Sequence, residues 1–290
     1  MKLAVIIPTC GRKPLLPRLI AHLQRQTRKP DIVLISAPDV TQAEIAETAA
    51  FKVVYLFGKQ GLTAQRNVGL VYALTTYDIV VFFDDDFLPA DDYLAEVEKA
   101  FETRPDWAGL TGNVIHDGIG GKGLSFDEGL QILDKQKPSA SEFQTASDEL
   151  STYGCNMAFR SASIGDLRFD ERLPLYGWQE DVDFSTQVGR RGRIVRLSAL
   201  RGVHLGVKSG RQSGVRLGYS QIVNPLYLMR KGTVPPSKAI TLMVRNVAAN
   251  LMRSMWPEPY IDRRGRLWGN LLAASHVLKR RIEPEHILNL

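Results

Sequence analysis

One stretch of this 290-residue chain decides its fold class: Ile79-Val80-Val81-Phe82-Phe83-Asp84-Asp85-Asp86. The five apolar residues predict a buried strand, and the three carboxylates then lie at its C-terminal end. In open α/β sheets, ligands bind at that edge. Three adjacent carboxylates repel one another, and a hard divalent cation such as Mg²⁺ or Mn²⁺ relieves the repulsion. A turn without a ligand is the alternative, because Asp also favours turns and helix caps.

Strand and helix patterns alternate over roughly the first hundred residues. The expected strands are 3–7, 31–36, 52–57 and 78–83, and the expected helices are 14–26, 41–50, 63–75 and 91–103. Such alternation predicts an α/β fold with a doubly wound, mostly parallel sheet. After Trp107 the regularity falls, and residues 117–150, rich in Gly, Ser, Asp and Lys, are expected to form loops. Ordered structure is expected again at 153–160, as a helix at 180–191 and as a strand at 193–197.

A second acidic cluster, Glu180-Asp181 with Asp183, follows about a hundred residues after the first. A carboxylate of this cluster can act as a general base. The pair also fits the charged first turn of a helix, because acidic side chains stabilise helix N-termini. A metal site at the first cluster and a general base at the second together suggest transfer of a group from a phosphate-activated donor to a hydroxyl.

Charge is divided unevenly along the chain. Residues 1–195 hold 21 Lys/Arg and 27 Asp/Glu, whereas residues 196–290 hold 16 Lys/Arg and 4 Asp/Glu. An acidic N-terminal part and a basic C-terminal tail suggest an anionic partner for the tail, either a membrane surface or nucleic acid. No recognised nucleic-acid motif supports the second option, so we expect no nucleic-acid partner.

The basic tail divides into two segments. Glycines recur in residues 206–235 around Lys208, Arg211 and Arg216, and we expect a mobile basic loop and connector there. Residues 236–290 carry an apolar stripe from Ile240 to Trp256 and are expected to form a basic amphipathic helical tail. Arg-rich, Trp-bearing amphipathic helices are typical of interfacial membrane association. Packing of the tail on the core or on a second subunit, in a homo-oligomer, is the alternative.

Composition bounds the class of protein. With 44% hydrophobic and 23% charged residues the chain is globular, and Cys10 and Cys155 form neither a disulfide framework nor a thiolate zinc motif. A reducing cytoplasm is therefore the expected compartment. No signal segment is recognised at the N-terminus, and no run of 18 apolar residues predicts a transmembrane helix. If the tail binds lipid, the protein is peripheral on the inner face of the membrane.

Five motifs in order resemble those of the family 2 glycosyltransferases, which are inverting enzymes of the GT-A fold. They are Val5–Arg12, Gln65–Gly69, Asp84–Asp86, the pair of segments Asn156–Arg160 and Phe169–Glu171, and Glu180-Asp181. The resemblance covers roughly residues 3–205. It implies a catalytic domain over 1–205, with a nucleotide-sugar-binding half at 1–105 and an acceptor-binding half at 106–205, followed by a C-terminal helical appendage. It also implies a role in polysaccharide biosynthesis.

The resemblance assigns site residues by position. The implied ligands of Mn²⁺ or Mg²⁺ are Asp84, Asp86 and His204. The implied donor-binding residues are Pro8, Thr9, Arg12, Asp39, Arg66, Asn67, Asp84 and Asp85, with Lys208 and Arg211 in a loop at the diphosphate. The implied catalytic and acceptor-binding residues are Asp181 as general base, Glu180, and Trp178. Arg66 has an alternative role as a structural ion-pair partner of the Asp cluster.

Two departures from the family pattern bear on specificity. The second strand ends Ser36-Ala37-Pro38-Asp39, where the family usually has Asp-Asp-Gly-Ser, so its base-reading acid is either Asp39, shifted, or absent. The Gln-x-x-Arg-Trp motif of processive members is also absent, which favours addition of a single sugar.

The expected partners are a nucleotide-diphosphate sugar and a glycan or lipid-linked acceptor. Two alternatives stay open at this point. A nucleotidyltransferase would need a phosphate loop that Cys10–Pro14 fits poorly, and a non-catalytic binding module would not need a base such as Asp181.

Overall fold

The computed structural model describes residues 1–44, 50–136, 146–209, 213–256 and 258–290. Part of the helix expected at 41–50 lies outside these residues. In the described part, Val40–Gln42 form a 3₁₀ turn, η1, whose N-cap is Asp39.

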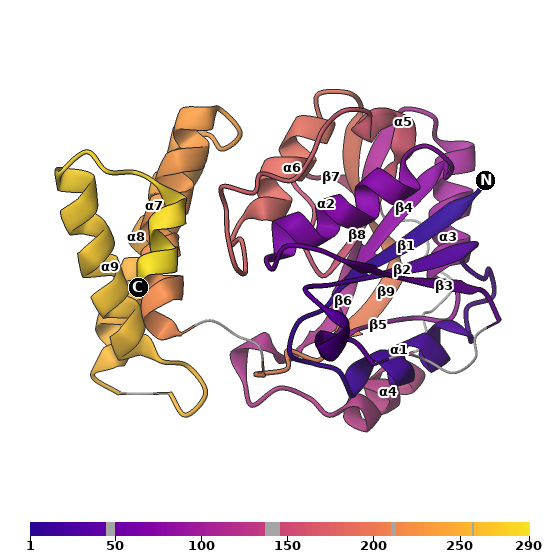
Figure 1. Ribbon diagram of the computed structural model, residues 1–290, viewed down its shortest axis with the longest axis horizontal. Coiled ribbons are helices and arrows are strands. Elements are labelled where there is room, and N and C mark those ends of the chain that lie inside the picture. The colour runs from indigo at the N-terminus through magenta and orange to yellow at the C-terminus, as the bar shows by residue number, and fades with distance from the viewer. Residues whose placement is uncertain (45–49, 137–145, 210–212, 257) are drawn as a thin grey trace.

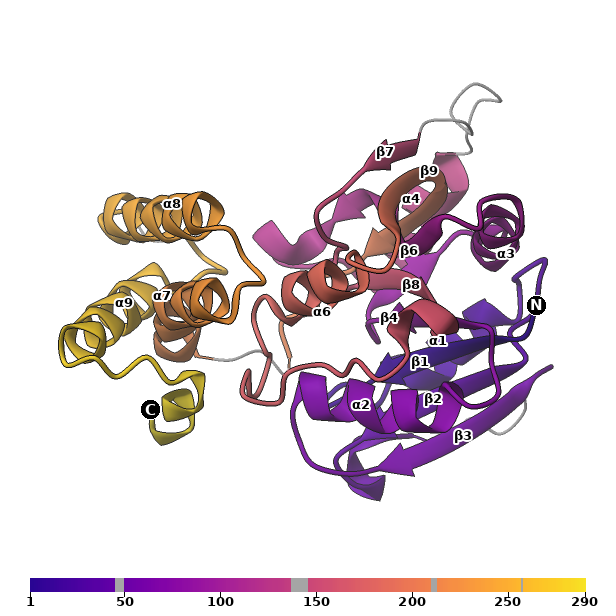
Figure 2. The ribbon, with the colours of Figure 1, turned by 90° about the horizontal axis from the view of Figure 1, so that it is seen from above.

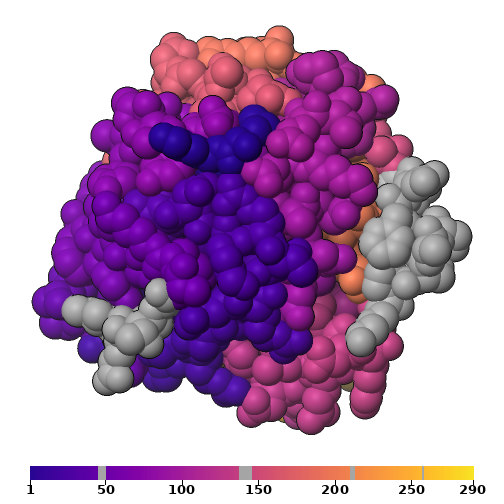
Figure 3. All heavy atoms as spheres, turned by 90° about the vertical axis from the view of Figure 1, so that its right-hand side faces the viewer, coloured from indigo at the N-terminus to yellow at the C-terminus, as the bar shows by residue number. Residues whose placement is uncertain are grey.

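The N-terminal half is a parallel sheet, as expected. Strands β1 (Leu3–Pro8), β2 (Ile32–Ala37), β3 (Lys52–Phe57) and β4 (Ile79–Phe83) lie in the order β3-β2-β1-β4. Every residue of β1, β2 and β4 is buried, because helices cover both faces of the sheet (Figure 2). This half occupies much of the face that is turned away from the C-terminal helices (Figure 3).

Alternate side chains of one strand enter two separate cores. Leu3, Val5 and Ile7 of β1 pack with helices α1 (Leu15–Leu23) and α3 (Tyr93–Thr103). Ala4 and Ile6 pack on the other face, with helix α2 (Leu62–Ala73). Side chains of a strand alternate between faces, so a strand buried on both faces reads as one continuous apolar run. The sheet is therefore doubly wound, and its strands end together at one edge.

The second half extends the same sheet with strands of mixed direction. Strand β8 (Asn156–Arg160) is antiparallel to β4 and to β6 (Trp107–Asp117). Strand β9 (Arg193–His204) is parallel to β6, and β5 (Phe87–Pro89) and β7 (Ala146–Asp148) are antiparallel to β9. In the described part of the chain, nine strands form one sheet along the path β3-β2-β1-β4-β8-β6-β9-β5, with β7 on β9.

The expectation of loops throughout 117–150 is wrong. Helix α4 occupies Phe126–Lys135, and its first turn is closed by a capping box between Ser125 and Glu128. Phe126 and Leu133 are buried, although the polar composition of the segment hides their helical spacing. Two shorter helices complete this half, α5 (Ser161–Ile164) and α6 (Glu180–Val188).

Three long helices form a C-terminal appendage beside the sheet domain (Figures 1 and 2). They are α7 (Gly214–Lys231), α8 (Pro236–Ser254) and α9 (Arg263–Leu278), and a 3₁₀ segment, η4 (Pro284–Asn289), follows. The expectation of a mobile loop at 206–235 is therefore wrong for 214–231. The glycines there serve close packing, since a Cβ on Gly218 would lie 2.0 Å from the Arg266 carbonyl oxygen of α9. None of the described helices is long and apolar enough to cross a membrane.

Hydrogen bonds hold the appendage against α6 and the segment before it. Asn224 of α7 donates to the Trp178 carbonyl at 2.8 Å. Lys231 Nζ lies 2.7 Å from Asp183 Oδ2 and 2.6 Å from Asp170 Oδ2. The appendage is thereby fixed to the element that carries Glu180-Asp181.

Candidate active site

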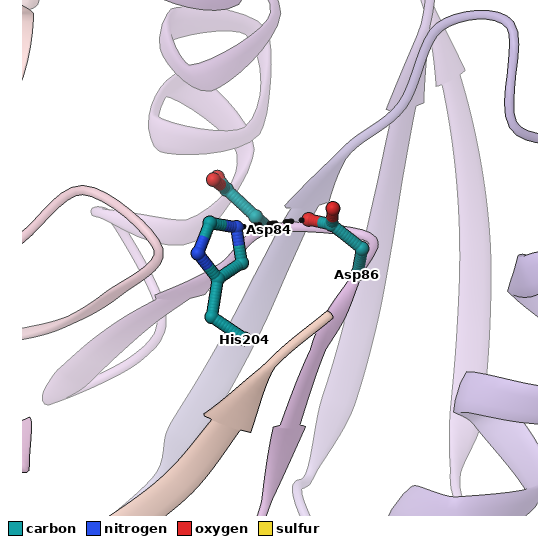
Figure 4. A group of neighbouring side chains, drawn as sticks. All are labelled: Asp84, Asp86 and His204. Carbon is teal, nitrogen blue, oxygen red and sulfur yellow. Dashed lines mark ion pairs between the residues drawn. The ribbon is translucent and has the colours of Figure 1, made fainter. Parts of the chain in front are cut away.

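The three carboxylates Asp84–Asp86 follow β4 directly, at the edge where the parallel strands end. Asp84 and Asp86 come together with His204, the last residue of β9. One ligand atom of each lies within 4.8 Å of the others. Figure 4 shows the two carboxylates and the imidazole converging from the ends of β4 and β9. The structure thus brings the three expected metal ligands together.

His204 is held between two carboxylates. Its Nε2 lies 3.4 Å from Asp86 Oδ1, and its Nδ1 lies 2.9 Å from Asp117 Oδ1. Burial opposes the imidazolium, but the contacts with the Asp117 and Asp86 carboxylates outweigh burial and raise the pKa of His204 to about 10. Burial likewise opposes ionisation of Asp86, yet His204 and Arg12 lower its pKa to about 2.

The cluster fits a divalent cation. Within the described residues, the buried Oδ1 of Asp86 makes no hydrogen bond of good geometry. Two carboxylates and one imidazole form a donor set that suits Mn²⁺, and the carboxylates also suit Mg²⁺. A cation bound here would take up the lone pairs of Asp84, Asp86 and His204 Nε2.

Asp85 points the other way, toward the turn after β1. Thr9 Oγ1 donates to its Oδ2 at 2.7 Å, and Arg12 Nη1 lies 2.7 Å from its Oδ1. Arg12 Nη1 also lies 3.1 Å from Asp86 Oδ1. Burial raises the pKa of Asp85 to about 6 against the opposing charge of Arg12. Arg12 therefore neutralises part of the acidic cluster and fixes the β1 turn beside it.

Arg66 joins the two acidic clusters. Its side chain is fully buried, with Nη1 on Glu180 Oε1 and Nη2 3.0 Å from Asp84 Oδ1. Nη2 also donates to the Gly154 carbonyl at 2.9 Å. Arg66 therefore forms ion pairs with Asp84 and Glu180. Its guanidinium does not line the cavity above the acidic cluster.

Glu180 and Asp181 open helix α6 after a residue in the left-handed region, Gln179 with φ 75°. Asp181 accepts hydrogen bonds from the Gly154 and Val182 amides, both at 2.8 Å. Burial is the main cause that raises the pKa of Glu180, to about 8, and the charge of Asp181 adds to it while Arg66 opposes it. Burial also raises the pKa of Asp181, against those backbone hydrogen bonds and Arg66.

A cavity of about 1140 Å³ opens above the acidic cluster. One wall consists of the β1 turn, the Asp cluster, His204 and Lys208, and the opposite wall comes from the appendage. A volume of this size accommodates a nucleotide sugar. Among the residues expected from the sequence, those that line the cavity are Pro8, Thr9, Arg12, Asp84, Asp85, Asp86, Trp178, His204 and Lys208.

Four other expected site residues do not line this cavity. Asn67 hydrogen-bonds the Phe169 backbone and lines a separate hollow with Lys59 and Glu171. Asp39 is exposed and caps η1 through the Thr41 amide. Glu180 and Asp181 lie beside Gly154, and Tyr176 and Trp178 from the preceding segment line the cavity instead. Arg211 lies outside the described residues.

Sequence reasoning missed Asp117 and Tyr153. Asp117 ends β6 and binds His204, and Tyr153 donates to Asp117 Oδ2 at 2.7 Å. Neither lies in a motif, and Asp117 meets His204 only through the register between β6 and β9. Arg216 and Arg264, on the appendage wall, were also absent from the expected site.

Comparison with protein families gives one match over more than half of the chain. The model described as glycosyl transferase family 2 matches residues 4–167. No curated protein matches this chain.

Solved structures share the fold at low sequence identity. S. aureus TarS 1–349 is 15% identical, with a TM-score of 0.56 over 97% of this chain and 82% of that one. The same TarS fragment in complex with UDP-GlcNAc is 15% identical, with a TM-score of 0.54 over 98% of this chain and 89% of that one. GalNAc-T7 with UDP, GalNAc and Mn²⁺ is 13% identical, with a TM-score of 0.55 over 96% of this chain and 55% of that one. The likeness shows a GT-A type fold with a C-terminal helical region.

Proposed function

This chain belongs to glycosyl transferase family 2, and from that premise we propose that it moves one sugar from a nucleotide-diphosphate sugar to an acceptor hydroxyl, with inversion. The observation that carries the proposal is the placement of Asp84, Asp86 and His204 on the wall of a cavity large enough for the donor. Arg66 ties this cluster to Glu180, so metal ligands and acidic pair belong to one buried network.

Departure of the diphosphate requires neutralisation of its charge. A bound Mn²⁺ or Mg²⁺ would supply this as a Lewis acid. Lys208, which lines the same wall, adds a cation beside the donor phosphates, and Arg12 holds Asp85 and Asp86 in place. Two of the similar structures carry UDP or UDP-GlcNAc, so UDP-sugars are the first donors to test.

The acceptor hydroxyl must lose a proton as it attacks the anomeric carbon from the face opposite the diphosphate. We assign Asp181 as the base, because a carboxylate with a raised pKa accepts a proton more readily near neutral pH. Its two backbone hydrogen bonds orient it, and Glu180 is held by Arg66. Direct attack assisted by one base inverts the anomeric configuration.

The acceptor side of the cavity is formed by the appendage. Arg216 and Arg264 line this wall, where their Nε atoms donate to the backbone carbonyls of Leu290 and Ser254. Positive charge facing the cavity suits an acceptor that carries a phosphate, as a lipid-linked glycan does. Trp178, on the same cavity, can stack on the acceptor sugar.

The outer surface of the appendage suits a membrane. Nine large apolar side chains are each more than half exposed there: Ile240, Val244, Leu251, Met252, Met255, Trp256, Trp268, Leu271 and Leu278. Basic residues such as Arg245 and Lys279 are exposed on the same helical region. Exposed apolar and cationic groups together favour association with an anionic lipid surface, where a lipid-linked acceptor resides.

A donor screen tests the proposed function. The enzyme is incubated with UDP-, GDP- and dTDP-sugars and Mn²⁺, and nucleotide products are separated by chromatography. We expect release of the nucleoside diphosphate from one donor class and its loss in EDTA. Release of a nucleoside monophosphate together with a sugar phosphate would instead indicate attack on the α-phosphorus, as in a nucleotidyltransferase. No turnover of any donor would indicate a binding module.

A further inference from the structure

We propose that Asp117, supported by Tyr153, is a positioning residue that holds His204 with Nε2 directed at the cation. The inference rests on the metal-assisted part of the proposed function. It assigns a role to two residues that lie outside every motif of the sequence.

The sheet itself brings Asp117 to His204. They are register partners at the ends of the parallel strands β6 and β9. Asp117 Oδ1 lies 2.9 Å from His204 Nδ1, and the His204 side chain is 7% exposed. A fixed backbone pairing and a buried ring leave the imidazole little freedom to turn.

Asp117 is itself fixed on both oxygens. The Ile119 amide donates to Oδ1 at 3.0 Å, and the Tyr153 hydroxyl donates to Oδ2 at 2.7 Å. The Tyr153 ring packs edge-on against the His204 ring, with 6.2 Å between centroids. The carboxylate therefore faces His204 in one orientation.

That orientation decides which ring nitrogen meets the cation. An ionised carboxylate only accepts hydrogen bonds, so Nδ1 donates its proton to Asp117. Nε2, on the side of Asp86, is then the nitrogen that would release its proton and offer its lone pair when a cation binds. Histidines that bind metals commonly donate the other ring N–H to a carboxylate, and loss of that partner costs about 10–100-fold in metal affinity.

The same support extends to the proposed base. The residue after Tyr153 is Gly154, whose amide donates to Asp181 at 2.8 Å and whose carbonyl accepts from Arg66 at 2.9 Å. Tyr153 and Gly154 thus connect the partner of His204 with Asp181. A purely structural role for Asp117, as the N-cap of the 3₁₀ turn η2 (Gly118–Gly120), is the competing explanation.

The chain contains a matched control for that explanation. Asp170 accepts from the backbone amide two residues on, Arg172, at 3.0 Å and from the Tyr227 hydroxyl at 2.7 Å. Asp117 has the same two kinds of bond at the same distances. Asp117 also binds His204, whereas Asp170 also binds Lys231 Nζ at 2.6 Å. Asp117→Asn and Asp170→Asn therefore alter similar local bonds, and only Asp117→Asn alters a contact with His204.

Mn²⁺ affinity of the full chain, measured by electron paramagnetic resonance with the metal alone, tests the proposal. We expect Asp117→Asn to bind Mn²⁺ about 10–100-fold more weakly and Tyr153→Phe to show a smaller loss in the same direction. Asp170→Asn and Tyr227→Phe should match the wild type. The nitrogen coupling of bound Mn²⁺ should be present in the wild type and absent in His204→Ala.

The results distinguish the positioning role of Asp117 from the metal site and from sugar transfer. If folded Asp117→Asn binds Mn²⁺ within threefold of the wild type, or if Asp170→Asn weakens binding equally, the positioning role is wrong. If the wild type binds no Mn²⁺, the metal site and the positioning role are both wrong. Sugar transfer without an effect of Asp117→Asn on Mn²⁺ affinity would leave the proposed function standing and overturn this inference.

Discussion

The sheet domain and the appendage place polar and apolar residues in opposite ways. In the sheet domain, all residues of β1, β2 and β4 are buried. In the appendage, the interface between helices holds a hydrogen-bonded amide network, in which Asn250 donates to Gln221 at 2.8 Å and to Asn270 at 2.9 Å. Several large apolar side chains of α8 and α9 are instead exposed, as Trp268 is at 58%.

This difference indicates what each region is built to do. The sheet domain is stabilised by apolar burial and can carry unfavourable carboxylates at its edge. The appendage gains specificity of packing from polar groups and glycines, and it leaves an apolar surface uncovered. A contiguous exposed apolar surface marks a site of interaction. Variants in each region test this division.

The largest effect should come from the carboxylate edge of the sheet. Asp86→Asn removes a charge that faces both His204 and Arg12. We expect turnover to fall by roughly 10³-fold or more, because Lewis-acid stabilisation of the leaving group contributes several kcal/mol. Steady-state kinetics with the donor found in the screen measures this. An unchanged rate for the wild type in EDTA would contradict the metal assignment.

Asp181→Asn is nearly isosteric and cannot accept the proton. We expect kcat to fall by about 10²-fold or more with little change in the KM for the donor, since general-base catalysis contributes about 10²–10⁴-fold. Asp183→Asn is the comparison variant, because Asp183 is ion-paired to Lys231. A near-normal kcat for Asp181→Asn would move the role to Glu180 or Asp183.

Asn250→Ala tests the polar interior of the appendage. The substitution leaves Gln221 and Asn270 without their buried partner, and an unsatisfied buried group costs about 1–3 kcal/mol. We expect the free energy of unfolding to fall by that amount in urea denaturation, with the loss confined to the appendage transition if the two regions unfold separately. Asn289→Ala, at an exposed position, is the control. Equal free energies of unfolding for the two variants would show that the amide network does not stabilise the appendage.

The smallest effect concerns the outer surface of the appendage. Leu271→Ser should weaken cosedimentation with anionic vesicles by roughly tenfold or more, because burial of one large apolar side chain contributes about 1.5–3 kcal/mol. Binding of the wild type should also decrease as salt rises. Val71→Ser, at an exposed apolar residue of α2, serves as the control. A wild type that stays in the supernatant at low salt would make this surface a contact between protein subunits.

Sequence patterns predicted the N-terminal half of the sheet because β1, β2 and β4 are continuous apolar runs. Ile79–Phe83 indicated β4, and the following Asp cluster indicated the edge at which Asp84, Asp86 and His204 meet. The resemblance to a family located His204 by its distance from Glu180-Asp181. Local pattern and tertiary structure agree in this half.

The appendage was harder to predict for a physical reason. Glycines and Pro225 lower the helix propensity of α7, so residues 214–231 suggested a loop. Packing of Gly218 and Gly269 against backbone atoms of the facing helix overrides that propensity. No local pattern reports such contacts between helices.

Parts of the site were hidden for a related reason. Arg66 stands in a recognisable motif, yet its complete burial between Asp84 and Glu180 depends on strands and helices far apart in sequence. Asp117 has no motif and reaches His204 only through the pairing of β6 with β9. Side-chain partners across a sheet follow from register, which single-sequence patterns leave open.

The anomeric configuration of the first product reports whether the sugar is transferred by one direct displacement. An α-linked nucleotide sugar accepted in the donor screen is incubated with the enzyme, Mn²⁺ and methanol as a surrogate acceptor, and the methyl glycoside is identified by proton NMR. Direct displacement assisted by Asp181 predicts the β-glycoside, and Asp181→Asn should form it at least 10²-fold more slowly. Formation of the α-glycoside by the wild type would contradict a single displacement at this site.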